Sequence, residues 1–299
     1  MTNQKTINIA DCLRESAATF PDKPALKFPE SRDRAGRVAY TQLTFRQLDE
    51  LVDRYAAGFQ NAGVRDGMRC LLMVKPCLEF TALTFALFRA GAAPVMIDPG
   101  MGIGGFLRCV RQARPSAMVG IPKAHLLRLF CRKTFAEVKH KFTIGHPVLP
   151  GTLSLADLEH GHTQPQPVQT KADDMAAILF TSGSTGPAKG VVYTHRILTT
   201  QLKMIRDNFG IGPDDTDLPC FPLFALFSTG VGACAVIPDM DPTRPAQVDP
   251  SRIVEAIQAN GVTYSFGSPA LWRVVGEYCA ENGIRLDSLN KIFMAGAPV

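Results

Sequence analysis

The residues with the clearest chemical character lie between Ile178 and His195, in the stretch ILFTSGSTGPAKGVVYTH. An apolar run from Met175 to Phe180 precedes small and hydroxylated residues, and a second strand-like run, 190–194, follows them. This order predicts a strand, a loop and a strand. Glycines let a ligand approach the backbone, while hydroxyls, N–H groups and a lysine can hold anions. The loop therefore has the chemistry of a polyphosphate site, with candidate residues Thr181, Ser182, Gly183, Ser184, Thr185, Gly186, Lys189 and Gly190.

The spacing of this loop differs from that of the common P-loop, in which G-x-x-x-x-G-K is followed by Ser or Thr. Counted from Gly183, the second glycine position holds Ala188, and Gly190 stands where the hydroxyl is required. A strand is also expected where the P-loop has a helix. A plain surface hairpin would explain the glycines, but turn formation does not call for so many hydroxyls together with a lysine.

The segment TSGSTGPAKG resembles the phosphate-binding signature of the AMP-forming adenylating enzymes, which include acyl-CoA synthetases, peptide-synthetase adenylation domains and firefly luciferases. The family signature usually reads T-S-G-S/T-T-G-x-P-K-G, so the proline stands one place earlier here, at Pro187. The resemblance implies that ATP and Mg²⁺ are bound and that the loop holds the β- and γ-phosphates. It also implies catalytic roles for Lys189 and Thr185.

The end of the chain resembles a second family segment, G-G-A/E-P, which lines the adenine pocket. Gly296, Ala297 and Pro298 match it, and Ala295 replaces its first glycine. His195 matches a histidine often found after the second strand in the family. A structural role for this single histidine remains equally open from the sequence.

The segment FPLFALF (221–227) aligns with the aromatic-rich P-L-x-H segment beside the family's acyl pocket, and Ala225 stands at the histidine position. The missing histidine argues against an ordinary CoA-thioester-forming enzyme. Together with 236–250 (VIPDMDPTRPAQVDP), the segment resembles the bacterial olefin-pathway branch, whose members convert 2-alkyl-3-hydroxy acids to β-lactones. We expect a substrate pocket formed by Phe221, Phe224, Ala225, Phe227 and Gly230.

The reaction that this resemblance implies is ATP-dependent activation of a long-chain fatty or 2-alkyl-3-hydroxy acid to an acyl-adenylate, with release of pyrophosphate. The adenylate would go on to an acyl-CoA, with CoA as a second substrate, or to a β-lactone. The family's Mg²⁺-linked Glu, ribose-binding Asp and C-terminal domain with its catalytic Lys are expected beyond Val299. Residues 1–299 would then be a partial N-terminal domain, inactive alone and without metal ligands of its own.

A basic stretch from Arg108 to Lys141 contains nine Lys or Arg residues and one acid, Glu137, whereas the whole chain has a net charge of +5. Arg108 and Arg111 have helical spacing, so the stretch forms either a solvated face or a docking face. The docking partner would be a phosphorylated carrier, CoA, another enzyme, a second copy or a lipid surface. We expect no nucleic-acid partner, because no aromatic stacking platform is evident among the charges. A non-catalytic protein that binds a partner through 108–141 is the alternative function.

The composition is that of a folded protein with a sizeable core, since 46% of the residues are hydrophobic and 20% are charged. Eight cysteines occur without a C-x-x-C pair, so neither a zinc site nor a disulfide framework is indicated. The N-terminus lacks an apolar signal core, and we expect a cytoplasmic protein. Residues 218–238 are uncharged, but their prolines and glycines favour buried helix and loop over a transmembrane span.

Strand patterns alternate with amphipathic helix patterns, which predicts an α/β fold of layered parallel sheets flanked by helices. We expect one α/β subdomain at 60–195 and a second from 1–59 plus 196–299. Three helix starts carry cap signals, at Thr44–Gln47, Asp249–Pro250 and Ser268–Pro269. Helices are expected at 7–20, 45–62, 79–90, 104–114, 123–132, 195–208, 251–260 and 269–282, and strands at 24–28, 37–40, 69–75, 92–98, 116–121, 175–180, 190–194, 263–267 and 291–299.

Overall fold

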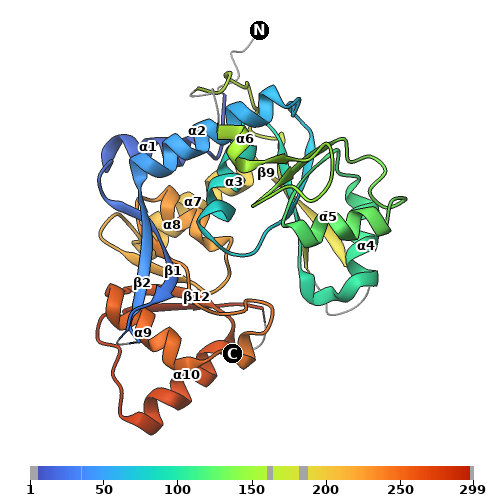
Figure 1. Ribbon diagram of the computed structural model, residues 1–299. Helices are drawn as coiled ribbons and strands as arrows, with labels where there is room; N and C mark the ends of the chain where they lie inside the picture. The colour runs from blue at the N-terminus through green and yellow to red at the C-terminus, as the bar shows by residue number, and fades with distance from the viewer. Residues whose placement is uncertain (1–5, 35, 160–163, 182–187, 297–299) are drawn as a thin grey trace. The chain divides into compact units, whose positions relative to one another are not determined.

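The computed structural model describes residues 6–34, 36–159, 164–181 and 188–296. The chain forms two compact units, each built around its own β-sheet (Figure 1). The first unit comprises Met1–Asp11, Asp49–Lys75 and Ala82–Gln201, and the second comprises Cys12–Leu48, Pro76–Thr81 and Leu202–Val299. Both sheets are mainly parallel and carry helices in their crossovers, which confirms the predicted α/β class.

The sheet of the first unit has the strand order β7-β6-β5-β3-β4-β8-β9. All neighbouring pairs are parallel except β8 and β9, which form an antiparallel hairpin at one edge. Parallel strands need crossover connections, and predicted helices provide those from β3 to β4, from β4 to β5 and from β5 to β6, whereas an irregular segment joins β6 to β7. The strands are β3 (Arg69–Met73), β4 (Ala93–Ile97), β5 (Ala117–Gly120), β6 (His140–Thr143), β7 (Leu153–Ser154), β8 (Met175–Thr181) and β9 (Lys189–Thr194).

The crossover direction distributes the helices of the first unit over the two faces of its sheet. The chain moves from β3 to β4 in one direction, and from β4 through β5 to β6 in the other. Because such connections are right-handed, α3 covers one face and both α4 and α5 cover the opposite face. Phe106 and Val110 of α4 and Ala124 of α5 accordingly share a core cluster. The helices are α2 (Phe45–Asn61, which begins in the second unit), α3 (Leu78–Arg89), η1 (Pro99–Met101), α4 (Gly102–Ala113), α5 (Pro122–Phe130), α6 (Leu155–Glu159) and α7 (His195–Phe209).

The sheet of the second unit has the strand order β13-β12-β10-β11-β1-β2, with only β1 and β2 antiparallel. Its core includes Leu218, Ile253 and Trp272. Residues 218–238, expected as helix and loop alone, include the end of β10 and all of β11, so that expectation was wrong in part. The elements are α1 (Asp11–Thr19), β1 (Pro24–Arg32), β2 (Val38–Thr44), β10 (Thr216–Pro219), α8 (Phe224–Gly230), β11 (Cys234–Val236), η2 (Pro245–Gln247), α9 (Pro250–Asn260), β12 (Tyr264–Gly267), α10 (Pro269–Asn282) and β13 (Lys291–Met294).

The three predicted helix starts are confirmed. Thr44 and Gln47 exchange hydrogen bonds between side chain and backbone, while the Asp249 and Ser268 side chains accept from the first turns of α9 and α10. Helix α1, in contrast, begins at Asp11 rather than at residue 7. The N–H of Ile7 donates to the Thr170 carbonyl, so these residues bond to a distant part of the chain before the helix starts.

Within the described ranges, the structure contains no helix with the length and apolar character needed to cross a bilayer. The polar segment 146–174, for which the sequence predicts no helix or strand, includes β7 and the short helix α6. Ser154 opens α6 as its cap, because its hydroxyl accepts from the Asp157 N–H at 3.1 Å and the Asp157 carboxylate accepts in return. This reciprocal cap is the physical reason for the missed helix.

Candidate functional site

The β8–β9 hairpin positions the predicted phosphate loop. Its last paired positions are Phe180 with Gly190 and Thr181 with Lys189, so the ladder holds both ends of the loop in register. The predicted hairpin of strand, loop and strand is therefore confirmed at its two strands. The predicted residues Ser182, Gly183, Ser184, Thr185 and Gly186 lie outside the described residues.

The loop begins at the carboxyl edge of the first unit's sheet. Strands β4 and β8 are parallel neighbours, and the N–H of Asp98, just after β4, donates to the Phe180 carbonyl at 3.2 Å. The Asp98 carboxylate accepts from the Gly100 N–H at 2.8 Å and so opens η1 ahead of α4. Ligands of parallel α/β sheets bind at this edge. Sequence reasoning did not single out Asp98, although an acid directly after a buried strand was a usable signal.

Lys189 and Gly190 have different structural surroundings. The Lys189 side chain is exposed and makes no ion pair within the ranges that the structure describes, so its charge is available to a ligand. A Cβ atom at position 190 would lie 2.7 Å from Cζ of the buried Phe180 ring. Gly190 is therefore required by packing inside the hairpin, independently of any ligand.

His195 is a buried structural histidine at the end of the hairpin. It is 2% exposed, and its Nδ1 atom accepts a hydrogen bond of 3.1 Å from the Ile9 N–H. Its ring also meets the edge of the Phe88 ring. Burial lowers its pKa to about 4, against a smaller opposing effect of Asp174, so the imidazole is neutral and accepts from the backbone. Of the two roles left open by the sequence, the geometry supports the structural one.

The aromatic residues of the predicted acyl segment gather around Phe224, which is stacked on Phe266 of β12 with ring centroids 3.4 Å apart and an interplanar angle of 10°. Phe221 and Phe227 lie 6.1 and 5.7 Å from the same ring. Ala225, at the family's histidine position, is fully buried. Phe266 was missed by sequence reasoning, since a contact across more than forty residues leaves no local pattern.

Gly230, the last residue predicted for the acyl pocket, has other surroundings. Its carbonyl accepts from the Ser16 hydroxyl of α1, and a Cβ atom there would approach Cys12 Sγ to 2.8 Å. It lines a small cavity of about 170 Å³ together with residues of α1 and α7. The structure thus brings Phe221, Phe224 and Phe227 together and places Gly230 against α1.

A buried carboxyl group lies beneath α8. Asp217 of β10 is 1% exposed, and its Oδ2 lies 2.5 Å from the Ser228 hydroxyl, which also lies 3.0 Å from the Phe224 carbonyl. Ser228 has one proton for two acceptors, and a protonated Asp217 removes the conflict by donating to Ser228. Burial raises the pKa of Asp217 to about 8, against a smaller lowering by the Ser228 hydrogen bond and with a lesser raising by Asp215, which agrees with the neutral form.

The predicted adenine segment follows β13. Gly296 has a φ of 95°, which favours glycine, and the preceding N–H of Ala295 donates to the Gly267 carbonyl at 3.3 Å. The turn after β13 is therefore fixed beside the end of β12. The other two predicted residues, Ala297 and Pro298, lie outside the described residues.

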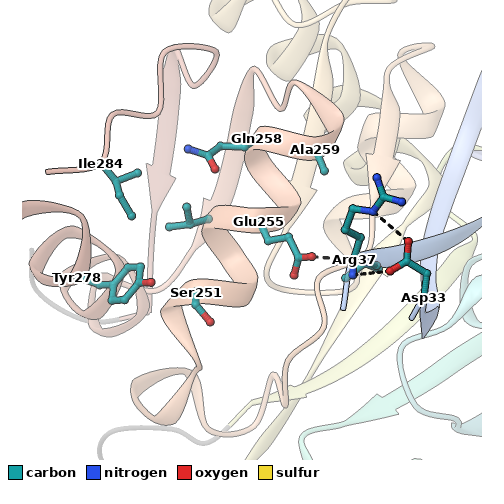
Figure 2. A pocket seen from close by; sticks show the side chains of 10 residues that line it. Asp33, Arg37, Ser251, Glu255, Gln258, Ala259, Tyr278 and Ile284 are labelled. Atoms are coloured by element: carbon teal, nitrogen blue, oxygen red, sulfur yellow. Dashed lines mark hydrogen bonds and ion pairs between the residues drawn. The ribbon is translucent and has the colours of Figure 1, made fainter. Parts of the chain in front are cut away.

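A groove of about 650 Å³ in the second unit is lined by none of the predicted site residues. Figure 2 shows Glu255 of α9 between Tyr278 on one side and Arg37 on the other. Its charges are engaged in ion pairs, because Glu255 binds Arg32 at 2.9 Å and Asp33 binds Arg37 at 3.0 Å. This network ties the β1–β2 hairpin to α9, which indicates a structural role.

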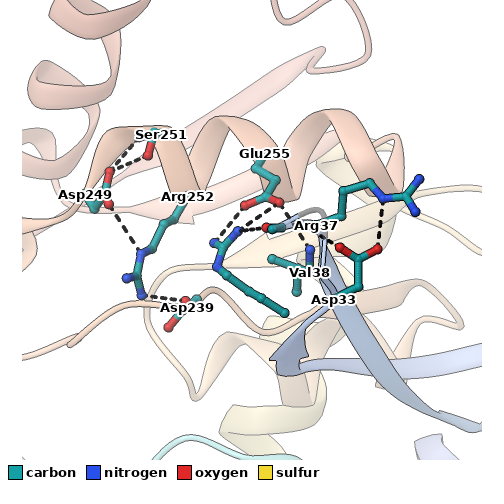
Figure 3. A network of polar contacts seen from close by, with 10 residues as sticks. Asp33, Arg37, Val38, Asp239, Asp249, Ser251, Arg252 and Glu255 are labelled. Atoms are coloured by element: carbon teal, nitrogen blue, oxygen red, sulfur yellow. Dashed lines mark hydrogen bonds and ion pairs between the residues drawn. The ribbon is translucent and has the colours of Figure 1, made fainter.

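The same network continues along α9 (Figure 3). Arg252 lies between two carboxylates, at 2.6 Å from Asp239 and 3.3 Å from Asp249. Among the residues that the structure describes, no group of three or more His, Cys, Asp or Glu side chains is placed to hold a metal ion. None of the eight cysteines, all of which lie in the described ranges, forms a disulfide.

The fold and the hairpin site define an adenylate-forming class of protein, and comparison with known proteins agrees. Residues 13–299 match the family of AMP-binding enzymes, and the chain belongs to that family. Over 296 residues it is 45% identical to an olefin beta-lactone synthetase of Stenotrophomonas maltophilia, a match covering 98% of this chain and 53% of the relative. The corresponding synthetase of Xanthomonas campestris is 43% identical, with 98% and 52% covered. The chain thus spans about half the length of these relatives.

The fold recurs in solved structures. A long-chain-fatty-acid–CoA ligase from Archaeoglobus fulgidus superposes with a TM-score of 0.83 at 22% identity, over 99% of this chain and 59% of that one. At this identity the likeness bears on the fold alone. It agrees with the predicted arrangement of layered sheets flanked by helices.

Proposed function

We propose that this chain is the N-terminal portion of an enzyme that uses ATP to activate a carboxylic acid as an acyl-adenylate, with release of pyrophosphate. The observation that carries the proposal is the β8–β9 hairpin, which holds Thr181 and Lys189 of the signature TSGSTGPAKG paired at the carboxyl end of β8 in a mainly parallel sheet. Family membership supports the same reaction class. The two units would be subdomains of this N-terminal portion, and cysteines without disulfides suit the reducing cytoplasm.

On this proposal the hairpin residues bind and orient the nucleotide. Lys189 supplies positive charge to the β- and γ-phosphates, and the loop hydroxyls and N–H groups donate to phosphate oxygens. Such donors, fixed in place before the reaction, stabilise the charge that develops on the departing pyrophosphate. Mg²⁺ would offset phosphate charge when bound, and its carboxylate ligand is expected outside residues 1–299. Gly296, Ala297 and Pro298 would contact the adenine.

The acid is proposed to be long-chain and 3-hydroxylated. Support comes from the names of the two similar relatives, from Ala225 in place of the family's histidine, and from the aromatic group around Phe224. The acyl-adenylate of such an acid can be attacked by its own 3-hydroxyl group, which closes a β-lactone and releases AMP. Full-length protein with a 3-hydroxy acid and ATP, with and without CoA, separates this outcome from acyl-CoA formation.

Pyrophosphate exchange by the full-length protein tests the activation step. The Lys189→Ala variant should lose about tenfold or more in exchange rate, the effect of one charge-assisted hydrogen bond to phosphate. Lys171→Ala, which removes an exposed lysine elsewhere in the first unit, is the matched control and should keep the wild-type rate. Absence of exchange in the wild-type protein, or equal rates in the two variants, would contradict the proposal.

A further inference from the structure

Helix α5 presents apolar side chains to solvent. Phe130 is 84% exposed, more than any other large apolar side chain in the described ranges, and Leu126 and Leu129 are each 42% exposed. A single exposed leucine is ordinary on a protein surface, but an outward phenylalanine beside two leucines on one short helix is not. Such an exposed apolar face is typical of a binding surface.

The helical spacing shows that the exposed side is separate from the core side. Lys123, Leu126 and Phe130 follow one another at i, i+3 and i+7, whereas Ala124 and His125 on the other side are buried. The His125 Nε2 atom bonds to the Phe142 carbonyl at 2.9 Å, which fixes the rotation of the helix. The apolar side chains are thus held outward.

Positive charge surrounds these apolar side chains. Lys123, Arg132 and Lys133 are exposed and make no ion pair with any described residue. Glu137, the single acid between residues 108 and 141, is bound to Arg114 at 2.8 Å, which also places the end of α4 beside this segment. We define the basic apolar face as Lys123, Leu126, Leu129, Phe130, Arg132 and Lys133. Phe130 is the one aromatic member of this face, so the face does not offer the several stacked rings of a nucleic-acid platform.

The basic apolar face ends away from the phosphate loop. β5 and β8 run in the same direction within the sheet, so both end at the edge where the loop begins. Helix α5 leaves that edge after β5 and returns to the opposite edge before β6, and Phe130 is its last residue. A partner on this face would therefore leave the nucleotide site of the same unit open.

We propose that the basic apolar face binds the surface of an anionic lipid bilayer. Phe130, Leu126 and Leu129 would enter the boundary between headgroups and acyl chains, while Arg132 and Lys133 reach the lipid phosphates. Charge complementarity favours this partner, because the segment 108–141 has a net charge of +8 and an anionic leaflet attracts each exposed cation.

The shape of the face favours a lipid surface over other anionic partners. Protruding side chains need no complementary pocket in a fluid bilayer, whereas an acidic protein would have to offer a cavity for Phe130. Single-stranded nucleic acid binds through several stacked rings, and this face has one. The inference does not depend on the proposed reaction, since the basic apolar face contains none of the residues assigned to ATP or acid.

The test is flotation of the full-length protein with two kinds of vesicle, phosphatidylcholine alone and an equal mixture of phosphatidylcholine and phosphatidylglycerol, without ATP. Binding is expected to the mixed vesicles only and should weaken with added salt. Arg132→Gln with Lys133→Gln should weaken binding about 30-fold, since each cation near an anionic leaflet contributes about fivefold. Phe130→Ala should weaken binding about five- to tenfold.

The controls remove comparable exposed side chains on the second unit. Arg273→Gln with Lys203→Gln removes two exposed positive charges that make no ion pair with a described residue, and Met204→Ala removes an apolar side chain that is 52% exposed. Both should bind as the wild-type protein does. Equal binding to both vesicle types, equal weakening by test and control variants, or no binding to the mixed vesicles would overturn the proposal; the last result would leave an acidic protein as the partner of this face.

Discussion

The β8–β9 hairpin and helix α8 are the two segments assigned to ligands, and they are held in different ways. The hairpin is held by a backbone ladder and ends at His195, a buried base kept neutral. Helix α8 is held by side chains, through the Asp217–Ser228 hydrogen bond and the stack of Phe224 on Phe266. Asp217 is a buried acid kept neutral. Two uncharged groups of opposite kind should make the two regions respond to pH in opposite directions.

The largest expected effect is the pH dependence of stability due to Asp217. Its folded-state pKa of about 8 lies above the ordinary value of 3.8, so the folded protein keeps a proton that the unfolded chain has lost. The stabilisation is complete below about pH 4 and is lost as the pH rises toward 8. From pH 5 to pH 8, wild type should lose ~4 kcal/mol of unfolding free energy relative to Asp217→Asn.

Urea unfolding of both proteins across this pH range measures the difference. Asp215→Asn is the control, because Asp215 contributes only a small part of the pKa shift of Asp217. A constant difference between wild type and Asp217→Asn would mean that Asp217 is ionised in the folded protein. In that case α8 would be held by a charge, and the contrast with the hairpin would disappear.

His195 should produce the opposite slope. Its folded-state pKa of about 4 lies below the ordinary value of 6.5, so the unfolded chain binds a proton that the folded protein excludes. Wild type should therefore lose ~3 kcal/mol relative to His195→Asn as the pH falls from 6.5 to 4. Thermal or urea unfolding measures this loss, and His146→Asn, which removes an exposed histidine, is the control. If the difference in unfolding free energy between wild type and His195→Asn does not change with pH, His195 is not the source of the acid sensitivity, and the proposed pH response of the hairpin would be wrong.

The sequence predicted most where the signal is local. The caps at Thr44, Asp249 and Ser268 each involve residues no more than three positions apart. The alternation of strand and helix patterns predicted the α/β class. Contacts between distant residues left no such pattern. The bond from Ile9 to His195 spans 186 positions and gives the histidine its structural role, and the bond from Ile7 to Thr170 spans 163 positions ahead of α1.

The candidate site divides in the same way. The phosphate loop could be predicted from residue types alone, because hydroxyls, glycines and a lysine close together are the groups that bind phosphate. The contacts of α8 depend on tertiary packing and could not be predicted. Gly230 packs against α1, Ala225 is buried, and Phe224 stacks on Phe266 of β12. Asp217 was overlooked because the role of an acid within an apolar strand depends on its partner, the Ser228 hydroxyl, which the sequence does not reveal.

Gly190→Ala tests whether the hairpin depends on backbone fit. The new Cβ atom would lie 2.7 and 2.9 Å from two atoms of the buried Phe180 ring, so we expect a loss of ~2 kcal/mol in unfolding free energy. Phe180→Leu removes those ring atoms, and the glycine substitution should cost less in that background. Gly104→Ala, within α4 and with open space around it, is the control and should be neutral or stabilising. An equal cost of Gly190→Ala in both backgrounds would contradict the packing explanation.

The smallest expected effect is the coupling between Phe224 and Phe266, and it tests whether α8 depends on side-chain packing. A double-mutant cycle with Phe224→Leu and Phe266→Leu should give an interaction free energy of ~1 kcal/mol, as for other paired rings. Phe221→Leu combined with Phe266→Leu is the control and should be additive, because Phe221 is 44% exposed and no ring contact joins it to Phe266 in the described part of the chain.

Enzyme kinetics of the same variants in the full-length protein test whether this ring stack affects binding of the acid substrate. If the stack shapes the acyl site, either leucine substitution should raise the KM for a long-chain acid more than the KM for ATP, because the hairpin that holds the phosphates belongs to the first unit. Additivity in the cycle together with unchanged KM values would show that α8 does not rely on the stack. The Asp217–Ser228 hydrogen bond would then be the contact on which the contrast rests.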